Sequence, residues 1–116
     1  MNDIKLMNKA ADNIRILAAS MVEKAKSGHP GGAMGGADFV NVLFSEFLVY
    51  DPKNPAWEGR DRYFQDPGHM SPMLYSVLAL AGKFTIDELK EFRQWGSVTP
   101  GHPEVNVMRG IENTSG

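Results

Sequence analysis

The sequence predicts a mostly α-helical chain with about one short strand and long loops rich in glycine and proline. Two segments carry apolar residues at helical spacing, whereas the single candidate strand is very short. The last stretch, about 20 residues long, has no sustained period, which is unusual for a compact domain. Because one strand cannot form a sheet, we expect a chain that stops before its sheet is built rather than a helical domain with an irregular tail.

The first helix is predicted from about Asp3 to Lys26. Its apolar residues recur at steps of three and four and share one face: Ile4, Met7, Ala11, Ile14, Ala18, Met21 and Ala25. Lys24 and Lys26 suit the negative end of the helix dipole, and Gly28 is a favourable stop signal.

A glycine loop is expected next, and then a second helix over roughly Ala37–Val49. The buried face of that helix is predicted to hold Val40, Leu43, Phe44, Phe47 and Leu48. Pro52 and Pro55 prevent a helix in the connector that follows. The segment "RYFQ", Arg62–Gln65, is the one candidate for a buried strand.

Two further helices are marked by their first residues. Ser71 resembles an N-cap with Pro72 at the first helical position, which predicts a helix through Ala81. The run Thr85–Glu88 has the form of a capping box, which predicts a helix to about Gln94.

Composition restricts the class of protein. The 116 residues are 42% hydrophobic and 22% charged, with a net charge of −2 and a pI near 5.9. Dispersed basic residues argue against nucleic-acid binding, and no run approaches the roughly 20 apolar residues that cross a membrane. The absence of cysteine excludes disulfides and thiolate metal sites. We expect a cytoplasmic protein with no nucleic-acid or membrane partner.

Three histidines share one local setting, because His29, His69 and His102 each follow a glycine in a loop or near a helix end. Binding residues collect in such loops, and imidazole exchanges protons near neutral pH. Solvated loop histidines are the plain alternative. A zinc site is disfavoured because the chain has no His-x-His or HExxH spacing.

Other motifs point away from common ligand sites. The stretch "GGAMGG" has neither the Gly-Lys-Ser/Thr ending of a phosphate-binding Walker loop nor the G-x-G-x-x-G spacing of a dinucleotide site. The neighbouring residues Arg60, Asp61 and Arg62 are interpreted as a solvated charge run or as local ion pairs.

Four motifs in order carry a family resemblance: "KSGHPGGAMGGAD", "DRYFQDPGHMS", "FRQWGSVTPGHPE" and "GIENTSG". Together they resemble the N-terminal part of transketolases, and residues 1–116 are similar to the opening of the diphosphate-binding domain. The resemblance implies an α/β parent domain around a parallel sheet that lies mostly downstream of Gly116.

The resemblance also implies a function. Transketolases transfer a two-carbon ketol unit between sugar phosphates in the pentose phosphate pathway, using thiamine diphosphate and Mg²⁺ or another divalent cation. They are homodimers whose active site lies between subunits. The family's metal ligands lie beyond Gly116, so the 116-residue polypeptide alone is expected to have no transketolase activity.

Residue roles follow only from the matching motifs. By resemblance, His69 hydrogen-bonds the cofactor diphosphate, and the backbone at Gly116 approaches the aminopyrimidine. His29 contacts substrate oxygens and helps to move protons, and His102 holds the hydroxyl on the terminal carbon of the donor. The entry to His69, "QDPGH", departs from the common Ser-Asn-Gly-His form, which bears on the direction of this side chain.

Two alternatives remain open from the sequence. Beside the N-terminal part of a transketolase, the alternatives are a subunit of a split transketolase or of a related thiamine-diphosphate enzyme, and a non-catalytic helical module for interactions. A continuation with Pro-Leu-Gly-Gln-Gly and then Gly-Asp-Gly favours the enzyme.

Overall fold

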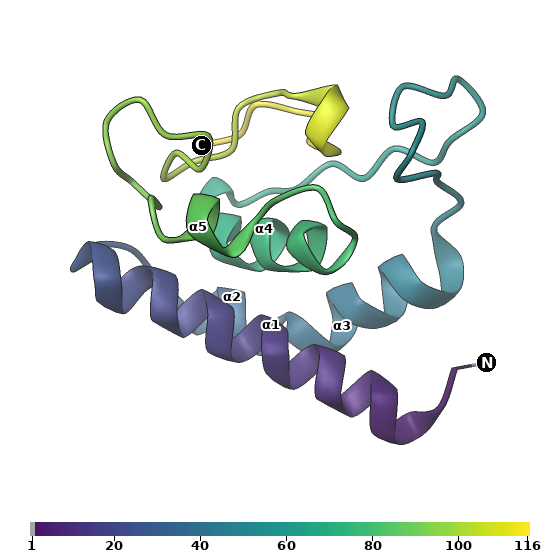
Figure 1. Cartoon of the computed structure of the whole chain (residues 1–116), viewed down its shortest axis with the longest axis horizontal. Helices are drawn as coiled ribbons and strands as arrows, with labels where there is room; N and C mark the ends of the chain where they lie inside the picture. Colours follow the sequence, from purple (N-terminus) through teal and green to yellow (C-terminus); the bar gives the residue numbers. More distant parts are fainter. Residues whose placement is uncertain (1) are drawn as a thin grey trace.

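The computed structural model describes residues 2–116 as a layered helical body of about 37 × 32 × 24 Å (Figure 1). Within these residues there is no β-strand, and the one β-bridge joins Asn106 and Ile111. The helices are α1 (Ile4–Ala25), α2 (Pro30–Gly35), α3 (Ala37–Val42), a π-helical turn (Leu43–Phe47), a 3₁₀ turn (Gly68–Met70), α4 (Ser71–Leu80), α5 (Ile86–Leu89) and a second 3₁₀ turn (Val107–Arg109). The mostly helical prediction is confirmed.

Helix α1 begins and ends within one residue of its predicted bounds. The Asp3 carboxylate caps it by accepting hydrogen bonds from the backbone N–H groups of Lys5 and Leu6. At the other end Lys26, in the left-handed conformation at φ 52°, closes the last turn. Four residues of the predicted face are buried: Ala11, Ile14, Ala18 and Met21.

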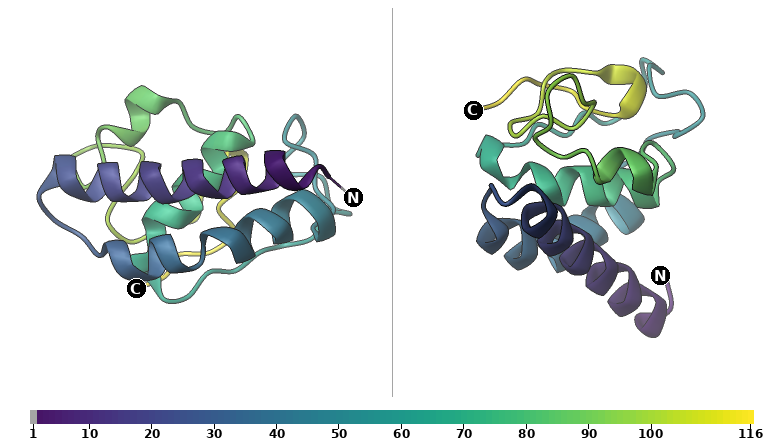
Figure 2. Two further views of the ribbon diagram at one scale, coloured as in Figure 1. Left: turned by 90° about the horizontal axis from the view of Figure 1, so that it is seen from below. Right: turned by 60° about the vertical axis from the view of Figure 1, so that its left-hand side comes forward.

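The expected glycine loop is wrong, because Pro30–Gly35 forms the short helix α2. Proline at the first position suits a helix start, since it lacks only an N–H that would have no helical partner. The predicted second helix is likewise divided into α3 and the π-helical turn, and Phe47 is 71% exposed instead of buried. Figure 2 shows α2 and α3 running back along α1.

Helix α4 crosses the α1–α3 layer and is its main core partner (Figures 1 and 2). Residues 71–78 are all buried, including Tyr75 at 0% exposure. The prediction of Ser71 as an N-cap is wrong. A 3₁₀ turn precedes α4, and the Ser71 hydroxyl donates instead to the carbonyl oxygen of Gly101 at 2.6 Å.

The strand predicted at Arg62–Gln65 does not form. Instead, the Asn113 side chain satisfies both backbone groups of Gln65, with N···O distances of 3.1 and 3.3 Å. The Thr85 capping box is confirmed, but α5 ends at Leu89 instead of Gln94. The chain turns there because Arg93 adopts φ 63° and its backbone N–H donates to the Thr99 carbonyl.

Candidate functional site

The rings of His29 and His69 lie together, although 40 positions separate them in the sequence. Their ring centroids are 4.9 Å apart with an interplanar angle of 64°. His29 is the N-cap of α2, and His69 lies in the 3₁₀ turn that leads into α4. The packing of these two elements therefore decides the distance between the rings.

Two glycines, Gly32 in α2 and Gly36 at its C-cap, lie close to this contact. A Cβ on Gly32 would lie 3.0 Å from the Met70 side chain, and one on Gly36 would lie 2.6 Å from the sulfur of Met73. A side chain at either position would require the Met70 or Met73 side chain to move, and this would disturb the packing between α2 and α4. Gly31 and Gly35 have nothing within 4 Å of their Cβ positions, so no contact among residues 2–116 requires glycine at either position.

The end of the chain reaches the same place. A Cβ on Gly68 would lie 2.7 Å from the carbonyl oxygen of Ser115 and 2.9 Å from the backbone nitrogen of Gly116. The Ser115 hydroxyl also donates to the Asp66 carboxylate at 3.0 Å. Gly116 in turn lies directly against the imidazole of His102, with no room for a side chain on that face.

The His102 loop is fixed to one face of α4. Ser71 and Tyr75, one turn apart, donate hydrogen bonds of 2.6 Å to the carbonyl oxygens of Gly101 and Pro100. Burial raises the pKa of Tyr75, so its hydroxyl stays protonated as a donor at neutral pH. Helix α4 therefore holds His69 at its start and the His102 loop along its side.

The structure thus brings His29, His69, His102 and Gly116 into one continuous cluster. All four are exposed, so the imidazole nitrogens can reach a ligand from solvent. Neutral imidazole can donate through one nitrogen and accept through the other, and both nitrogens donate once it is protonated. Such a group can bind anionic oxygens or carry a proton to and from a carbonyl oxygen.

Sequence reasoning missed the residues that support this cluster. Arg60 was interpreted as part of a local or solvated charge run, which is wrong. It forms a two-pronged ion pair with Glu112, 52 positions away, with N···O distances of 3.0 and 2.9 Å. Asn113 and Arg93 were not singled out at all. The only signal in the sequence was the presence of Arg60 in "RDR" and of Glu112 and Asn113 in "GIENTSG". No local pattern indicates that Arg60 and Glu112 form an ion pair.

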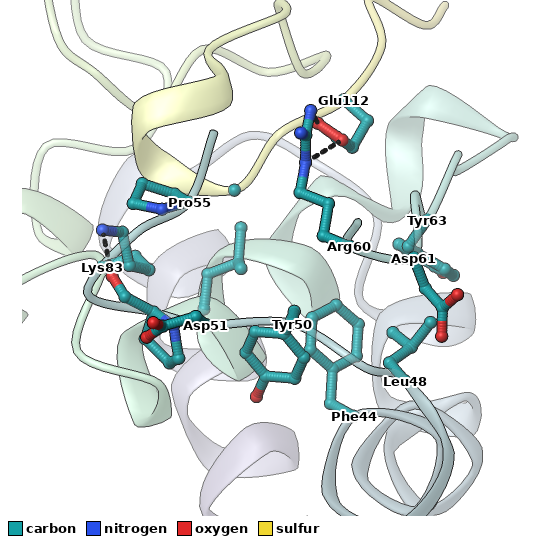
Figure 3. A pocket seen from close by; sticks show the side chains of 13 residues that line it. Phe44, Leu48, Tyr50, Asp51, Pro55, Arg60, Asp61, Tyr63, Lys83 and Glu112 are labelled. Carbon is teal, nitrogen blue, oxygen red and sulfur yellow. Dashed lines mark hydrogen bonds and ion pairs between the residues drawn. The ribbon is translucent and has the colours of Figure 1, made fainter. Parts of the chain in front are cut away.

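A small pocket in residues 2–116 lies away from the histidines. It has a volume of about 40 Å³, close to the room that one or two waters need, and aromatic and aliphatic side chains line much of it (Figure 3). The rings of Tyr50 and Tyr63 each pack edge-on against Phe44 along its wall. It contains none of the three histidines, so we treat it as a packing gap.

Neither metal nor membrane features stand out in residues 2–116. No group of three histidine or carboxylate side chains there is arranged to hold a metal ion. Within the same residues, no helix is both long and apolar enough to cross a bilayer.

Comparisons with known proteins agree on one family. The model of the transketolase thiamine diphosphate-binding domain matches residues 6–116. The chain is 52% identical over 112 residues to the transketolase of Buchnera aphidicola, covering 96% of this chain and 17% of that protein. It is 50% identical over 107 residues to transketolase 1 of Escherichia coli, covering 91% and 16%.

Solved structures give the same result. A transketolase variant from Pichia stipitis superposes with a TM-score of 0.91 at 42% identity, covering 97% of this chain and 17% of that one. The Campylobacter jejuni transketolase gives 0.90 at 45% identity, covering 99% and 18%. The chain thus spans about a sixth of the length of its relatives. Its mostly helical architecture matches one part of the α/β thiamine diphosphate-binding domain, and the chain belongs to the transketolase family.

Proposed function

We propose that the protein containing this chain is a transketolase, which transfers a two-carbon ketol unit between sugar phosphates. The observation that carries the proposal is the meeting of three exposed histidines from separate segments at one place, in a chain of this family. A related Pichia stipitis transketolase has been solved in complex with sedoheptulose-7-phosphate, which supports sugar phosphates as the substrate class.

The cluster has the chemistry that thiamine diphosphate needs from a protein. We propose that His69 donates a hydrogen bond to the diphosphate and that the Gly116 backbone approaches the aminopyrimidine. Gly116 fits this role because its position against His102 excludes a side chain, so backbone alone is presented. Bound thiamine diphosphate supplies the carbanion and the electron sink for carbon–carbon bond cleavage.

The remaining two histidines are proposed to act on the substrate. His29, beside His69, would hydrogen-bond substrate oxygens and exchange protons at the reacting carbonyl oxygen. His102 would hold the hydroxyl on the terminal carbon of the donor. The protein's contribution is then orientation and proton movement, both of which depend on how α2, α4 and the last residues of the chain are packed together.

Several finer features remain proposals. Residues 2–116 offer no group for a metal, so we propose that the ligands for Mg²⁺ or another divalent cation come from other parts of the protein. A homodimer, a cytoplasmic location and a place in the pentose phosphate pathway are proposed from family membership. We also propose that residues 1–116 are the first portion of the diphosphate-binding domain and are inactive by themselves.

Two substitutions in the complete protein test the assignment. We expect His69→Ala to weaken thiamine diphosphate binding roughly tenfold to hundredfold, because a hydrogen bond to a charged group is lost. We expect His102→Ala to raise the KM for the donor ketose phosphate while cofactor affinity stays within about twofold. Calorimetric titration with thiamine diphosphate and Mg²⁺ measures the first effect, and steady-state kinetics measures the second.

Lys90→Ala on exposed α5 is the control, since Lys90 lies outside the cluster. A folded wild-type protein that binds no thiamine diphosphate would overturn the proposed function and would favour a non-catalytic helical module. Equal effects of both histidine variants on both quantities would contradict the division of roles.

A further inference from the structure

Arg93 occupies a constrained position just after α5. Its backbone has φ 63°, which is uncommon for a residue with a side chain, and its N–H donates to the carbonyl oxygen of Thr99 at 3.1 Å. This turn directs the Arg93 side chain toward residues 27–28 and toward Gly101. Those two segments directly precede His29 and His102.

The guanidinium contacts both segments. Its Nη1 donates to the Ser27 hydroxyl at 3.0 Å, and a Cβ on Gly28 would lie 3.6 Å from its Nε. On the other side, a Cβ on Gly101 would lie 2.9 Å from Nε and 3.1 Å from Cζ. The planar group therefore fills the space between the two glycines, and Gly101 must lack a side chain for it to fit.

Packing contacts, more than hydrogen bonds or ion pairs, hold the Arg93 guanidinium in place. The Nε atom is buried and has no hydrogen-bond partner within residues 2–116, and no carboxylate there forms an ion pair with Arg93. The guanidinium carbon lies 5.6 Å from the centre of the Phe92 ring, which favours the cation. A buried N–H without an acceptor costs free energy, so stability alone is a poor reason for an arginine here.

We propose that Arg93 is a positioning residue that sets the separation between the His29 and His102 segments. The inference rests on the proposed function, because those two histidines are the ones assigned to the substrate. The Arg93 guanidinium contacts Ser27, Gly28 and Gly101 and not the turn that holds His69, so we expect it to act mainly on the substrate side of the cluster. Lysine cannot replace it, because a flexible ammonium does not present a flat surface to two glycines.

The test uses the complete enzyme and the variants Arg93→Lys and Arg93→Met. We expect both to raise the KM for the donor ketose phosphate about tenfold or more, because small misplacements of positioning groups weaken productive binding strongly. We expect kcat to change less than about threefold, and the thiamine diphosphate Kd to stay within about twofold. Lys90→Met, which removes a nearby exposed charge, is the matched control and should change none of these quantities.

A double-substitution cycle identifies the contact itself. Gly101→Ala should also raise donor KM, because the added methyl group displaces the guanidinium. In the Arg93→Met background the same change should have little further effect, since the group that it displaces is gone. Additive effects would show that Gly101 does not act through Arg93 and would overturn the inference.

Two other results also decide the matter. Unchanged donor KM in both Arg93 variants of an active enzyme would overturn the inference and leave the proposed function intact. Parallel losses of donor and cofactor affinity would show a general structural role and would overturn it too. A wild-type enzyme without ketol transfer would instead overturn the proposed function, and the inference with it.

Discussion

Gly68, which precedes His69, lies against the segment that carries Gly116. A Cβ there would meet backbone atoms of Ser115 and Gly116, and backbone cannot move aside as a flexible side chain can. Gly31, by contrast, has open space at its Cβ position although it lies in the same glycine-rich region as His29. Glycine is therefore required by the surrounding atoms at position 68 but not at position 31.

Gly68→Ala in the complete protein should lower the free energy of unfolding by about 1–3 kcal/mol, the usual cost of overpacking. It should also weaken thiamine diphosphate binding, because the chain end that carries Gly116 is forced away from His69. Thermal unfolding and calorimetric titration measure the two effects. Gly31→Ala is the control, and a loss of affinity as large as that of Gly68→Ala would contradict this steric explanation.

At the scale of elements, the sequence predicts helices well where the signal is local. The Thr85 capping box was readable because it involves residues three positions apart, and the extent of α1 was readable from its apolar period. Helix α2 was not predicted, because its glycines disfavour a helix and its packing against α1 and α4 involves residues distant in the sequence. The expected strand failed for the same reason, since its partner is the side chain of Asn113.

The capping box of α5 is also coupled to a distant residue. Glu88 accepts hydrogen bonds from the Thr85 backbone N–H at 2.9 Å and from Arg109 at 2.9 and 2.7 Å. Hydrogen bonding to Arg109, and next to Thr85, lowers the pKa of Glu88 below the ordinary value of 4.5. A lowered pKa means that the stabilisation is complete above pH 4.5 and is lost as pH falls through the lowered value.

Glu88→Gln keeps the capping-box geometry and removes the charge. At pH 7 we expect it to lower the free energy of unfolding by about 1 kcal/mol, and this difference from wild type should shrink as the pH falls below about 4.5. Chemical unfolding of the complete protein from pH 7 to pH 3 measures it, because the loss begins below pH 4.5 and continues through the lowered pKa. Thr85→Ala should instead cost about 1 kcal/mol with a weaker dependence on pH, because the main hydrogen bond that it loses is to the backbone N–H of Glu88. A pH-independent Glu88→Gln effect would contradict the assignment.

At the scale of the whole molecule, three loops converge on one site because long-range contacts hold them there. The motifs predict His29, His69, His102 and Gly116 as site residues; the structure places these four residues together, and their roles stay predictions. The supporting contacts were beyond prediction, since Arg60 and Glu112 lie 52 positions apart and neither has a local pattern that names the other. Contacts between residues so far apart in the sequence depend on the tertiary structure, and a short segment of sequence does not determine it.

The Arg60–Glu112 pair is the strongest of these supports. Both side chains are more than nine-tenths buried, Arg60 also donates to the Trp57 carbonyl at 2.8 Å, and hydrogen bonding to Glu112 raises the pKa of Arg60 (Figure 3). Glu112 lies four residues before Gly116, so the pair fixes the start of the segment that reaches the histidines. Removing one partner leaves the other charged and buried, which is worse than removing both.

We therefore expect Arg60→Met and Glu112→Leu each to lower the midpoint of chemical unfolding of the complete protein and to weaken thiamine diphosphate binding. The double variant should be more stable than the sum of the two single effects predicts, because it leaves no unpaired buried charge. Chemical unfolding of all four proteins gives the coupling free energy, and calorimetric titration shows whether cofactor affinity follows it. Strictly additive losses would mean that the two side chains contribute separately and that the last residues of the chain are positioned by other contacts.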